Sequence, residues 1–487
     1  MHQGKSIIAA YLGFFVPGAA AFLLLPEIIN NLGSVRFAYF SNLYSYSVLL
    51  LMLDLGISAG ISRRVSAALN IKSTNSRVSN LIWSAIYAQI IIAGIVIIGS
   101  AIFLAFMNFP TSADIPKKEI IIAYVVITLS AAPAMFCSVF RGAYEGSGRH
   151  YSASFIRASS SITALLIPAI LPLITANLGI IFSAILILRI FIALVAGLNI
   201  RKTFGKPIFK SRNIVIKYIK GLLGDSALLS IGHLAGSLIT LGLIDRFFLT
   251  NYVDSALLID YVLPRDIIIR LLLIPSAMCV VLMPYLSGKY NPKYASNADL
   301  LGLQNLFSAQ AWPICGLLIL WCESIIIYLS DGMASGTAVS LLILMSLGVF
   351  LNLNAFIFHT LLIATGNIWR SARRHLMQLP LIIVCSFYLA VAGNLEALGF
   401  LWLSFCIGDV IMTFIICRNL SLLPRGHKPI SKKSLLLFCG LLLLLMLSSI
   451  QVISIKILIS ILLATILLKN INDLRKKSEV FGFEQKQ

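Results

Sequence analysis

Two stretches decide the fold: GLLGDSALLSIGHLAGSLITLGLIDRFFL at residues 221–249 and LLIDYVLPRDIIIRLLLIPSAMCVVLMPYL at residues 257–286. Each is long enough to cross a lipid bilayer, which takes about 20 helical residues. The ionisable side chains within them are Asp225, His233, Asp245, Arg246, Asp260, Arg265, Asp266 and Arg270. A charge inside lipid is costly, so each of these side chains needs a partner or a purpose.

The composition of the whole chain indicates an integral membrane protein. Of its 487 residues, 59% are hydrophobic and only 11% are charged, and the mean hydropathy is +0.95. A soluble globule of this size needs more polar side chain to cover its surface. Apolar runs of bilayer length recur along the sequence, which favours spanning helices over the shorter alternating strands of a barrel. We therefore expect an all-α polytopic membrane protein.

The apolar runs predict fourteen spanning helices. Their expected ranges are 6–30, 37–61, 80–107, 118–140, 152–176, 178–200, 221–249, 256–286, 303–329, 337–363, 377–394, 397–417, 434–449 and 451–468. Most lysines and arginines fall in alternate connections, which lie on one side of the membrane. The connections on the opposite side contain only Arg36, Lys117 and Lys118. Because positive charge accumulates on the cytoplasmic side, both termini are expected in the cytoplasm.

The charge pattern also argues against several classes of function. A net charge of +20 would suit nucleic-acid binding, but membrane topology explains most of it. The outer connections are too short for a folded domain, which argues against a membrane glycosyltransferase or polymerase. The eight cysteines lie in apolar segments without metal-type spacing, and no phosphate-binding glycine loop is present. We expect no metal, no cofactor and no ATP-driven pump in this chain.

An internal repeat divides the chain into two lobes. Residues match at an offset of 218 in four places: Glu27 with Asp245, Arg141 with His359, Gly148 with Gly366, and Arg157 with His375. The predicted organisation is a lobe at 1–200 (helices 1–6), a basic cytoplasmic linker at 201–220, a lobe at 221–420 (helices 7–12), and two further helices with a tail at 421–487. Because each lobe holds an even number of helices, the repeat is parallel, and a binding site is expected between the lobes.

Five arginines within or near spans are the candidate substrate-binding residues: Arg265, Arg270, Arg189, Arg246 and Arg157. Arginine stays charged and pairs bidentately with phosphate, so these side chains would suit an anionic substrate. Arg270 follows Asp266 by four residues, a spacing that predicts an intrahelical ion pair. The alternative is that the arginines pair with acids on neighbouring helices, and Arg157 lies near enough to the cytoplasmic end to reach the interface.

Five acids are the candidates for coupling transport to protons or sodium ions: Asp54, Asp225, Asp245, Glu27 and Asp409. Structural pairing is an equally good interpretation for each of them. His233, in the middle of the seventh predicted span, either titrates or donates a hydrogen bond to a backbone carbonyl, and we favour the hydrogen bond.

Several stretches resemble the Wzx-type O-antigen and polysaccharide flippases of the MOP (MATE-like) transporter superfamily. They are GSVRFAYFSNLYSYSVLLLMLDLGISAGISRRVSAAL, FRGAYEGSGRHYSASFIR, IDRFFL and YVLPRDIIIRLLLIPSAMCVVLMPYLS. The resemblance implies two six-helix lobes around a cavity that opens alternately to either side, with two extra helices. It places the family's acidic position in the second helix on Asp54, and its acid–base pair at the end of the seventh on Asp245 and Arg246.

The resemblance implies a flippase that is not an enzyme. Its substrate would be an undecaprenyl-pyrophosphate-linked oligosaccharide, moved from the cytoplasmic to the periplasmic leaflet of the bacterial inner membrane. The implied partners are this polyprenyl-pyrophosphate-linked glycan, membrane lipid and H+ or Na+, with no nucleic acid. The alternatives are a MATE-type multidrug/cation antiporter, disfavoured by fourteen helices and by buried arginines, and a lipid II flippase with the same chemistry and a different headgroup.

Overall fold

The computed structural model describes residues 2–54, 56–70, 75–106, 115–205, 218–219, 232, 234–240, 242–254, 257–272, 297–424, 426–448 and 453–480. Nearly all of these residues are helical, as expected where lipid offers no partner for backbone N–H and C=O groups. The chain divides into two compact units, Met1–Leu258 and Ile259–Gln487, which we call unit 1 and unit 2. Asp225 and His233, two of the ionisable residues of the deciding stretch, lie outside the described residues.

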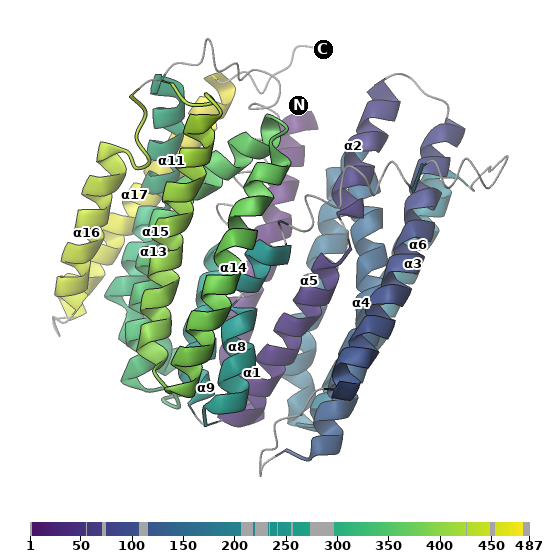
Figure 1. Ribbon diagram of the computed structural model, residues 1–487, viewed down its shortest axis with the longest axis horizontal. Coiled ribbons are helices and arrows are strands. Elements are labelled where there is room, and N and C mark those ends of the chain that lie inside the picture. Colours follow the sequence, from purple (N-terminus) through teal and green to yellow (C-terminus); the bar gives the residue numbers. More distant parts are fainter. Residues whose placement is uncertain are drawn as a thin grey trace. The chain divides into compact units, whose positions relative to one another are not determined.

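Unit 1 is built from long helices that pack along their lengths. Its described helices are α1 (His2–Met52), α2 (Ile57–Asn70), α3 (Asn75–Phe106), α4 (Lys117–Gly146), α5 (His150–Ile170), α6 (Leu178–Phe204) and α8 (Leu243–Tyr252). Helices α4 and α6 lie side by side, and α3 packs on α4 (Figure 1). The side chain of Asn177 accepts a hydrogen bond from the Ile180 N–H and caps the start of α6.

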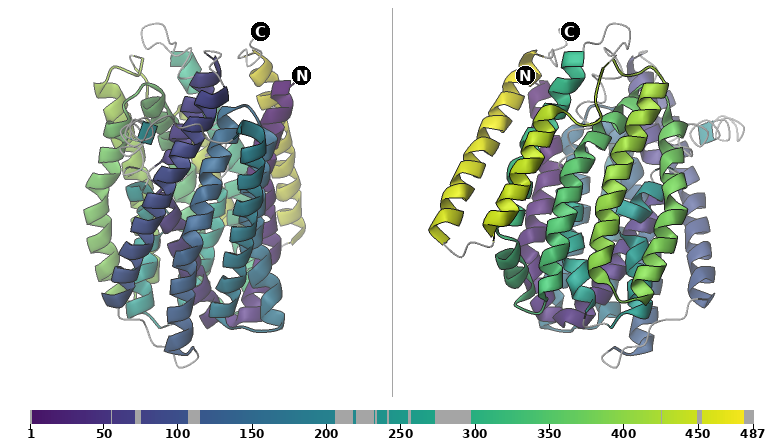
Figure 2. Two further views of the ribbon diagram at one scale, coloured as in Figure 1. Left: turned by 90° about the vertical axis from the view of Figure 1, so that its right-hand side faces the viewer. Right: turned by 60° about the vertical axis from the view of Figure 1, so that its left-hand side comes forward.

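Unit 2 repeats much of this arrangement. Its described helices are α9 (Leu258–Leu271), α11 (Asn297–Leu320), α12 (Cys322–Ser330), α13 (Gly336–Ala364), α14 (Ile368–Val391), α15 (Leu395–Asn419), α16 (Lys432–Ser448) and α17 (Ile453–Val480). Helices α13 and α15 pack closely along their lengths, with α14 against α15. The last two helices, α16 and α17, pack on α11 (Figure 2).

The helix ends that match at the 218-residue offset have the same backbone geometry. Gly148, two residues after the end of α4, has φ 73°, and Gly366, two residues after the end of α13, has φ 79°. After each glycine, the next N–H donates back to a carbonyl five residues earlier: Arg149 to Tyr144, and Asn367 to Leu362. Glycine is needed there because this helix-ending turn requires a left-handed residue. The two helix ends therefore share one backbone geometry at positions that the sequence aligns, and the two-lobe repeat stays a prediction.

The number of spans is only partly tested by the structure. Within the described residues, eight helices are long and apolar enough to cross a membrane. The first two predicted spans form one helix, α1, which is interrupted by non-helical geometry at Gly33. The boundary predicted at residue 61 was wrong, because α1 ends at Met52 and a break around Asp54 separates it from α2. The count of fourteen and the linker at 201–220 remain predictions.

A close crossing of α2 and α4 holds the core of unit 1 together. The glycines of the segment GAYEG, Gly142 and Gly146, face the backbone of α2. A Cβ atom at Gly142 would lie 2.3 Å from the carbonyl oxygen of Ser58, and one at Gly146 would lie 2.3 Å from that of Ser62. Small residues four apart let helix backbones approach in a membrane, where packing rather than the hydrophobic effect drives helix association. This GxxxG seam was not predicted from the sequence.

Replacing Gly142 with alanine should therefore destabilise the protein, because the backbone of α2 must move to admit the new methyl group. Overpacking of this kind costs about 1–3 kcal/mol. The matched control is Gly94→Ala on α3, where nothing lies within 4 Å of the added Cβ. Thermal unfolding in detergent should show a lower midpoint for Gly142→Ala and an unchanged or slightly higher one for Gly94→Ala. Equal midpoints would contradict the tight seam.

Candidate functional site

Arg189 is a buried cation held by hydroxyl groups. It lies on α6, 11 residues after Leu178, which places it about 16 Å along the helix and near the middle of a span. Its side chain is only 4% exposed. One guanidinium nitrogen, Nη1, donates to Ser47 Oγ at 3.0 Å and to Ser130 Oγ at 2.7 Å. Among the described residues, no carboxylate forms an ion pair with Arg189.

Arg246 also meets serine hydroxyls of α1. It is 1% exposed, and its Nη1 donates to Ser41 Oγ and Ser45 Oγ, each at 2.7 Å. The two serines are four residues apart, so they lie on the same face of α1. Asp245, which precedes Arg246, is buried in the first turn of α8, where the helix dipole favours an acid. The predicted acid–base pair at the end of the seventh span is thus buried within unit 1.

Arg265 is a fully buried cation of unit 2. It is 0% exposed, and its guanidinium carbon lies 3.9 Å from the ring centroid of Trp402 on α15. A cation stacked on an indole in a desolvated site gains roughly 2 kcal/mol or more. The indole is itself fixed, since its Nε1 donates to the Met345 carbonyl at 3.4 Å. The sequence identified Arg265 but gave no indication that Trp402 would be its neighbour.

Arg270 and Arg157 differ in their charge environment. Arg270 is half-buried, and its Nη1 has no hydrogen-bond partner among the described residues. The ion pair to Asp266 expected from the spacing stays a prediction. Arg157 instead pairs with Glu145 at 2.8 Å, so a carboxylate already balances its charge.

The candidate coupling acids are distributed over several environments. Asp54 lies in the break between α1 and α2, where its oxygens accept hydrogen bonds from the Gly56 N–H at 2.8 Å and the Ser138 hydroxyl at 3.3 Å. Glu27 is exposed on α1. Asp260, the remaining acid of the deciding stretch, accepts hydrogen bonds from both the N–H and the hydroxyl of Ser335, and so anchors the start of α13.

Asp409 belongs to a buried polar group that joins three helices of unit 2. We call it the Arg374 cluster; its members are Asn352, His359, Ser371, Arg374, His375, Asp409 and Thr413. Arg374 Nε lies 3.3 Å from Asp409 Oδ1, and both residues are 3% exposed. The spans expected at 337–363 and 377–394 leave Arg374 in the connection between them, and this boundary was wrong. The reason is that α14 begins at Ile368 rather than at the expected residue 377, so Arg374 lies inside the helix.

The remaining contacts of the Arg374 cluster centre on the guanidinium. Arg374 Nη1 donates to the Thr413 hydroxyl, and Nη2 donates to His375 Nε2 at 2.9 Å and to His359 Nδ1 at 3.4 Å. The Asn352 amide donates to Asp409 Oδ2 at 3.3 Å. The internal repeat is the sequence feature that could have pointed to the two histidines, because it aligns His359 with Arg141 and His375 with Arg157.

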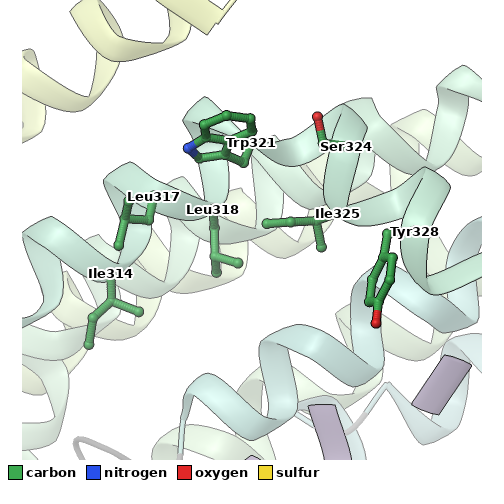
Figure 3. Close-up of a pocket in the computed structure, with 7 residues that line it drawn as sticks. All are labelled: Ile314, Leu317, Leu318, Trp321, Ser324, Ile325 and Tyr328. Carbon is green, nitrogen blue, oxygen red and sulfur yellow. The ribbon is translucent and has the colours of Figure 1, made fainter. Parts of the chain in front are cut away.

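Two further features bear on what the chain can bind. No group of three or more His, Cys, Asp or Glu side chains in the described part of the chain is arranged to hold a metal ion. An apolar hollow of about 400 Å³ lies where α11 gives way to α12, lined by leucine and isoleucine side chains with Trp321, Ser324 and Tyr328 (Figure 3). Because this lining is almost wholly apolar, the hollow suits a hydrocarbon chain rather than a phosphate.

Comparison with known proteins supports the fold. The sequence matches no family model, and the search of curated proteins gave no match. Among solved structures, the lipid II flippase MurJ in an inward closed conformation is 15% identical, with a TM-score of 0.68 over 96% of this chain and 99% of that chain. A MATE P26A mutant is 14% identical, with a TM-score of 0.63 over 86% and 96%.

A third similar structure is a MOP superfamily transporter from Pyrococcus furiosus Vc1 (DSM3638), described as having a binding pocket of reverse polarity that suggests a different function. It is 14% identical to this chain, with a TM-score of 0.61 over 86% of this chain and 95% of that chain. At this level of identity the comparisons establish the fold. The chain has the helical fold of MATE and MurJ transporters.

Removing one partner of the Arg374–Asp409 pair should be more damaging than removing both. A lone buried charge costs about 3–5 kcal/mol, whereas replacing both partners with neutral groups is often tolerated. We expect Arg374→Met and Asp409→Asn each to lower the thermal unfolding midpoint. The unfolding midpoint of the double variant should fall by less than the sum of the decreases in the two single variants. Strict additivity would show that the two side chains do not interact.

Proposed function

We propose that this protein is a flippase that carries an undecaprenyl-pyrophosphate-linked oligosaccharide, an O-antigen or capsule repeat unit, from the cytoplasmic to the periplasmic leaflet of the bacterial inner membrane. Transport proceeds by alternating access of two lobes, with both termini cytoplasmic and no covalent chemistry. The observation that carries the proposal is the mid-span guanidinium of Arg189, which is held by two hydroxyl groups and forms no ion pair among the described residues.

An arginine in this position suits an anionic substrate for an energetic reason. An arginine at the centre of a span costs about 2.5–3.5 kcal/mol to insert. Hydrogen bonds to charged groups return about 1.5–3 kcal/mol each. Ser47 and Ser130 therefore offset the cost of burying Arg189 without neutralising its charge, which remains able to attract a phosphate. Arg246 adds a second buried guanidinium with serine partners in the same unit.

Arg265 and Arg270 contribute the cationic groups of unit 2. Arg265 retains its charge against the face of Trp402, and an aromatic face attracts a cation without removing the charge. Arg270 is half-buried. A pyrophosphate carries several negative oxygens that match guanidinium donors. We assign Arg157 a lesser part, because Glu145 already pairs with it.

The fold similarity leaves two alternative substrates. The lipid II flippase MurJ matches over 96% of this chain, so a different polyprenyl-pyrophosphate glycan is the second candidate. The MATE similarity makes an organic-cation antiporter the third, but buried guanidiniums would repel such a substrate. Coupling to H+ or Na+ through Asp54, Asp225, Asp245, Glu27 or Asp409 is part of the proposal. Asp409 already has an arginine partner, which favours the other acids for binding Na+.

The test is transport of a fluorescent undecaprenyl-pyrophosphate oligosaccharide in proteoliposomes. Arg189→Ala and Arg265→Ala should each reduce transport roughly 10- to 100-fold, the effect of losing one or two charge-assisted hydrogen bonds. Arg189→Lys and Arg265→Lys should recover part of the rate, because lysine retains the charge but not the bidentate geometry. A lipid II analogue and an organic cation dye, assayed in parallel, distinguish the alternative substrates.

Arg149→Ala is the matched control, because it removes the same charge from an exposed position at the start of α5. It should transport at the wild-type rate. All variants are compared at equal amounts of folded protein in the membrane. Normal transport by both Arg189→Ala and Arg265→Ala would refute electrostatic capture. Transport of the dye alone would instead favour the antiporter.

A further inference from the structure

The Arg374 cluster contains two histidines that anion capture does not use. Both imidazoles face the same guanidinium: His375 Nε2 at 2.9 Å and His359 Nδ1 at 3.4 Å from Arg374 Nη2. His359 lies on α13 and His375 on α14, while Asp409, which pairs with Arg374, lies on α15. The guanidinium of α14 therefore reaches α13 through His359 and α15 through Asp409, while His375 meets it from the same helix.

The chemistry of arginine fixes the protonation of both rings. A guanidinium has five N–H donors and no acceptor, and it stays protonated in proteins. The imidazole nitrogen that meets Arg374 must therefore accept, so it carries no proton. His375 then has its proton on Nδ1. His359, whose Nδ1 also lies 2.5 Å from the Ser371 hydroxyl, has its proton on Nε2.

A proton added to either ring changes an acceptor into a donor. The new N–H would point at the N–H groups of Arg374, and two positive charges would face each other at hydrogen-bond distance. A like charge at this range disfavours the charged form of a titratable group. The imidazolium must leave Arg374, whereas the contacts of Arg374 to Asp409 and Thr413 can remain.

The other charged and titratable groups around the cluster come from the helices packed against α14 and α15. Helix α15 contributes Asp409, and also Cys406 and Cys417, which lie within electrostatic range of Asp409 and Arg374 respectively. Helix α9 contributes Arg265, which lies within range of Cys406. Asp409 is the carboxylate that pairs with Arg374, so an added proton raises the positive charge of the cluster.

We propose that the Arg374 cluster is a proton-binding site in which His375 Nε2 and His359 Nδ1 are the acceptors. Binding of a proton breaks the contact of that ring with Arg374 while the Arg374–Asp409 pair stays closed, and at His359, which lies on α13, this loosens α14 from α13. The site links proton binding to helix packing in unit 2. Its role in driving transport rests on the proposed function, whereas the site itself rests on the geometry of the cluster.

The first experiment is nitrogen NMR of the full-length protein in lipid nanodiscs, with only histidine labelled. The chain has six histidines, and single His→Gln variants assign their signals. At alkaline pH the proposal requires the Nδ1–H tautomer for His375 and the Nε2–H tautomer for His359. Acidification should protonate both rings. The opposite tautomer at His375, or an imidazolium already present at alkaline pH, would overturn the proposal.

The second experiment tests the link to Arg374. In the double variant Arg374→Gln/Asp409→Asn, which replaces the pair with two neutral amides, the titration midpoint of His375 should rise by about one pH unit or more. His427 is the internal control, since it lies in the connection between α15 and α16 and burial lowers its pKa independently of the cluster. An equal shift at His427, or no shift at His375, would contradict the proposal.

The third experiment measures function. His359→Gln removes the ring that links α13 to Arg374 and cannot bind a proton in the relevant pH range, so it should flatten the pH profile of transport. His427→Gln, the matched substitution outside the cluster, should keep the wild-type profile. An unchanged profile in His359→Gln would overturn the coupling. The NMR titration needs no substrate. It can therefore test the proton site even if the proposed flippase function is wrong.

Discussion

A guanidinium inside a helix bundle keeps its charge, so the helices around it must supply groups that make burial tolerable. Four different solutions occur in the part of the chain that the structure describes. Arg189 is held by serine hydroxyls, Arg265 stacks on an indole, Arg157 meets a carboxylate, and Arg374 meets a carboxylate together with two imidazoles. The choice of partner determines whether the charge remains available to a ligand or is balanced within the fold.

The close packing of a few helices makes these partners possible. In unit 1, the contact of α4 with α6 brings Ser130 to Arg189. In unit 2, the corresponding contact of α13 with α15 brings Asn352 to Asp409 and Met345 to Trp402. The two units therefore use the same helix pairing for different chemistry. In unit 1, the hydroxyl groups do not neutralise the charge of Arg189. In the matching region of unit 2, Asp409 balances the charge of Arg374.

Glycine has two structural roles in this helix packing. Gly142 and Gly146 let the backbones of α2 and α4 meet, and Gly148 and Gly366 turn the chain at the ends of α4 and α13. The turns could be anticipated because the glycines recur at a fixed offset in the sequence. The seam could not, because a GxxxG segment in a sequence does not say which helix it will meet.

The sequence by itself determined the class of protein and which residues carry unusual charge. Apolar length and charge asymmetry required a polytopic helical protein, and Arg189, Arg246 and Arg265 were identifiable because arginine is rare inside spans. The tertiary structure decided the partners, since a partner on another helix is set by packing and not by spacing along the chain. Arg374, expected in a connection, lies buried beside Asp409. Arg265 stacks on Trp402, which lies on another helix.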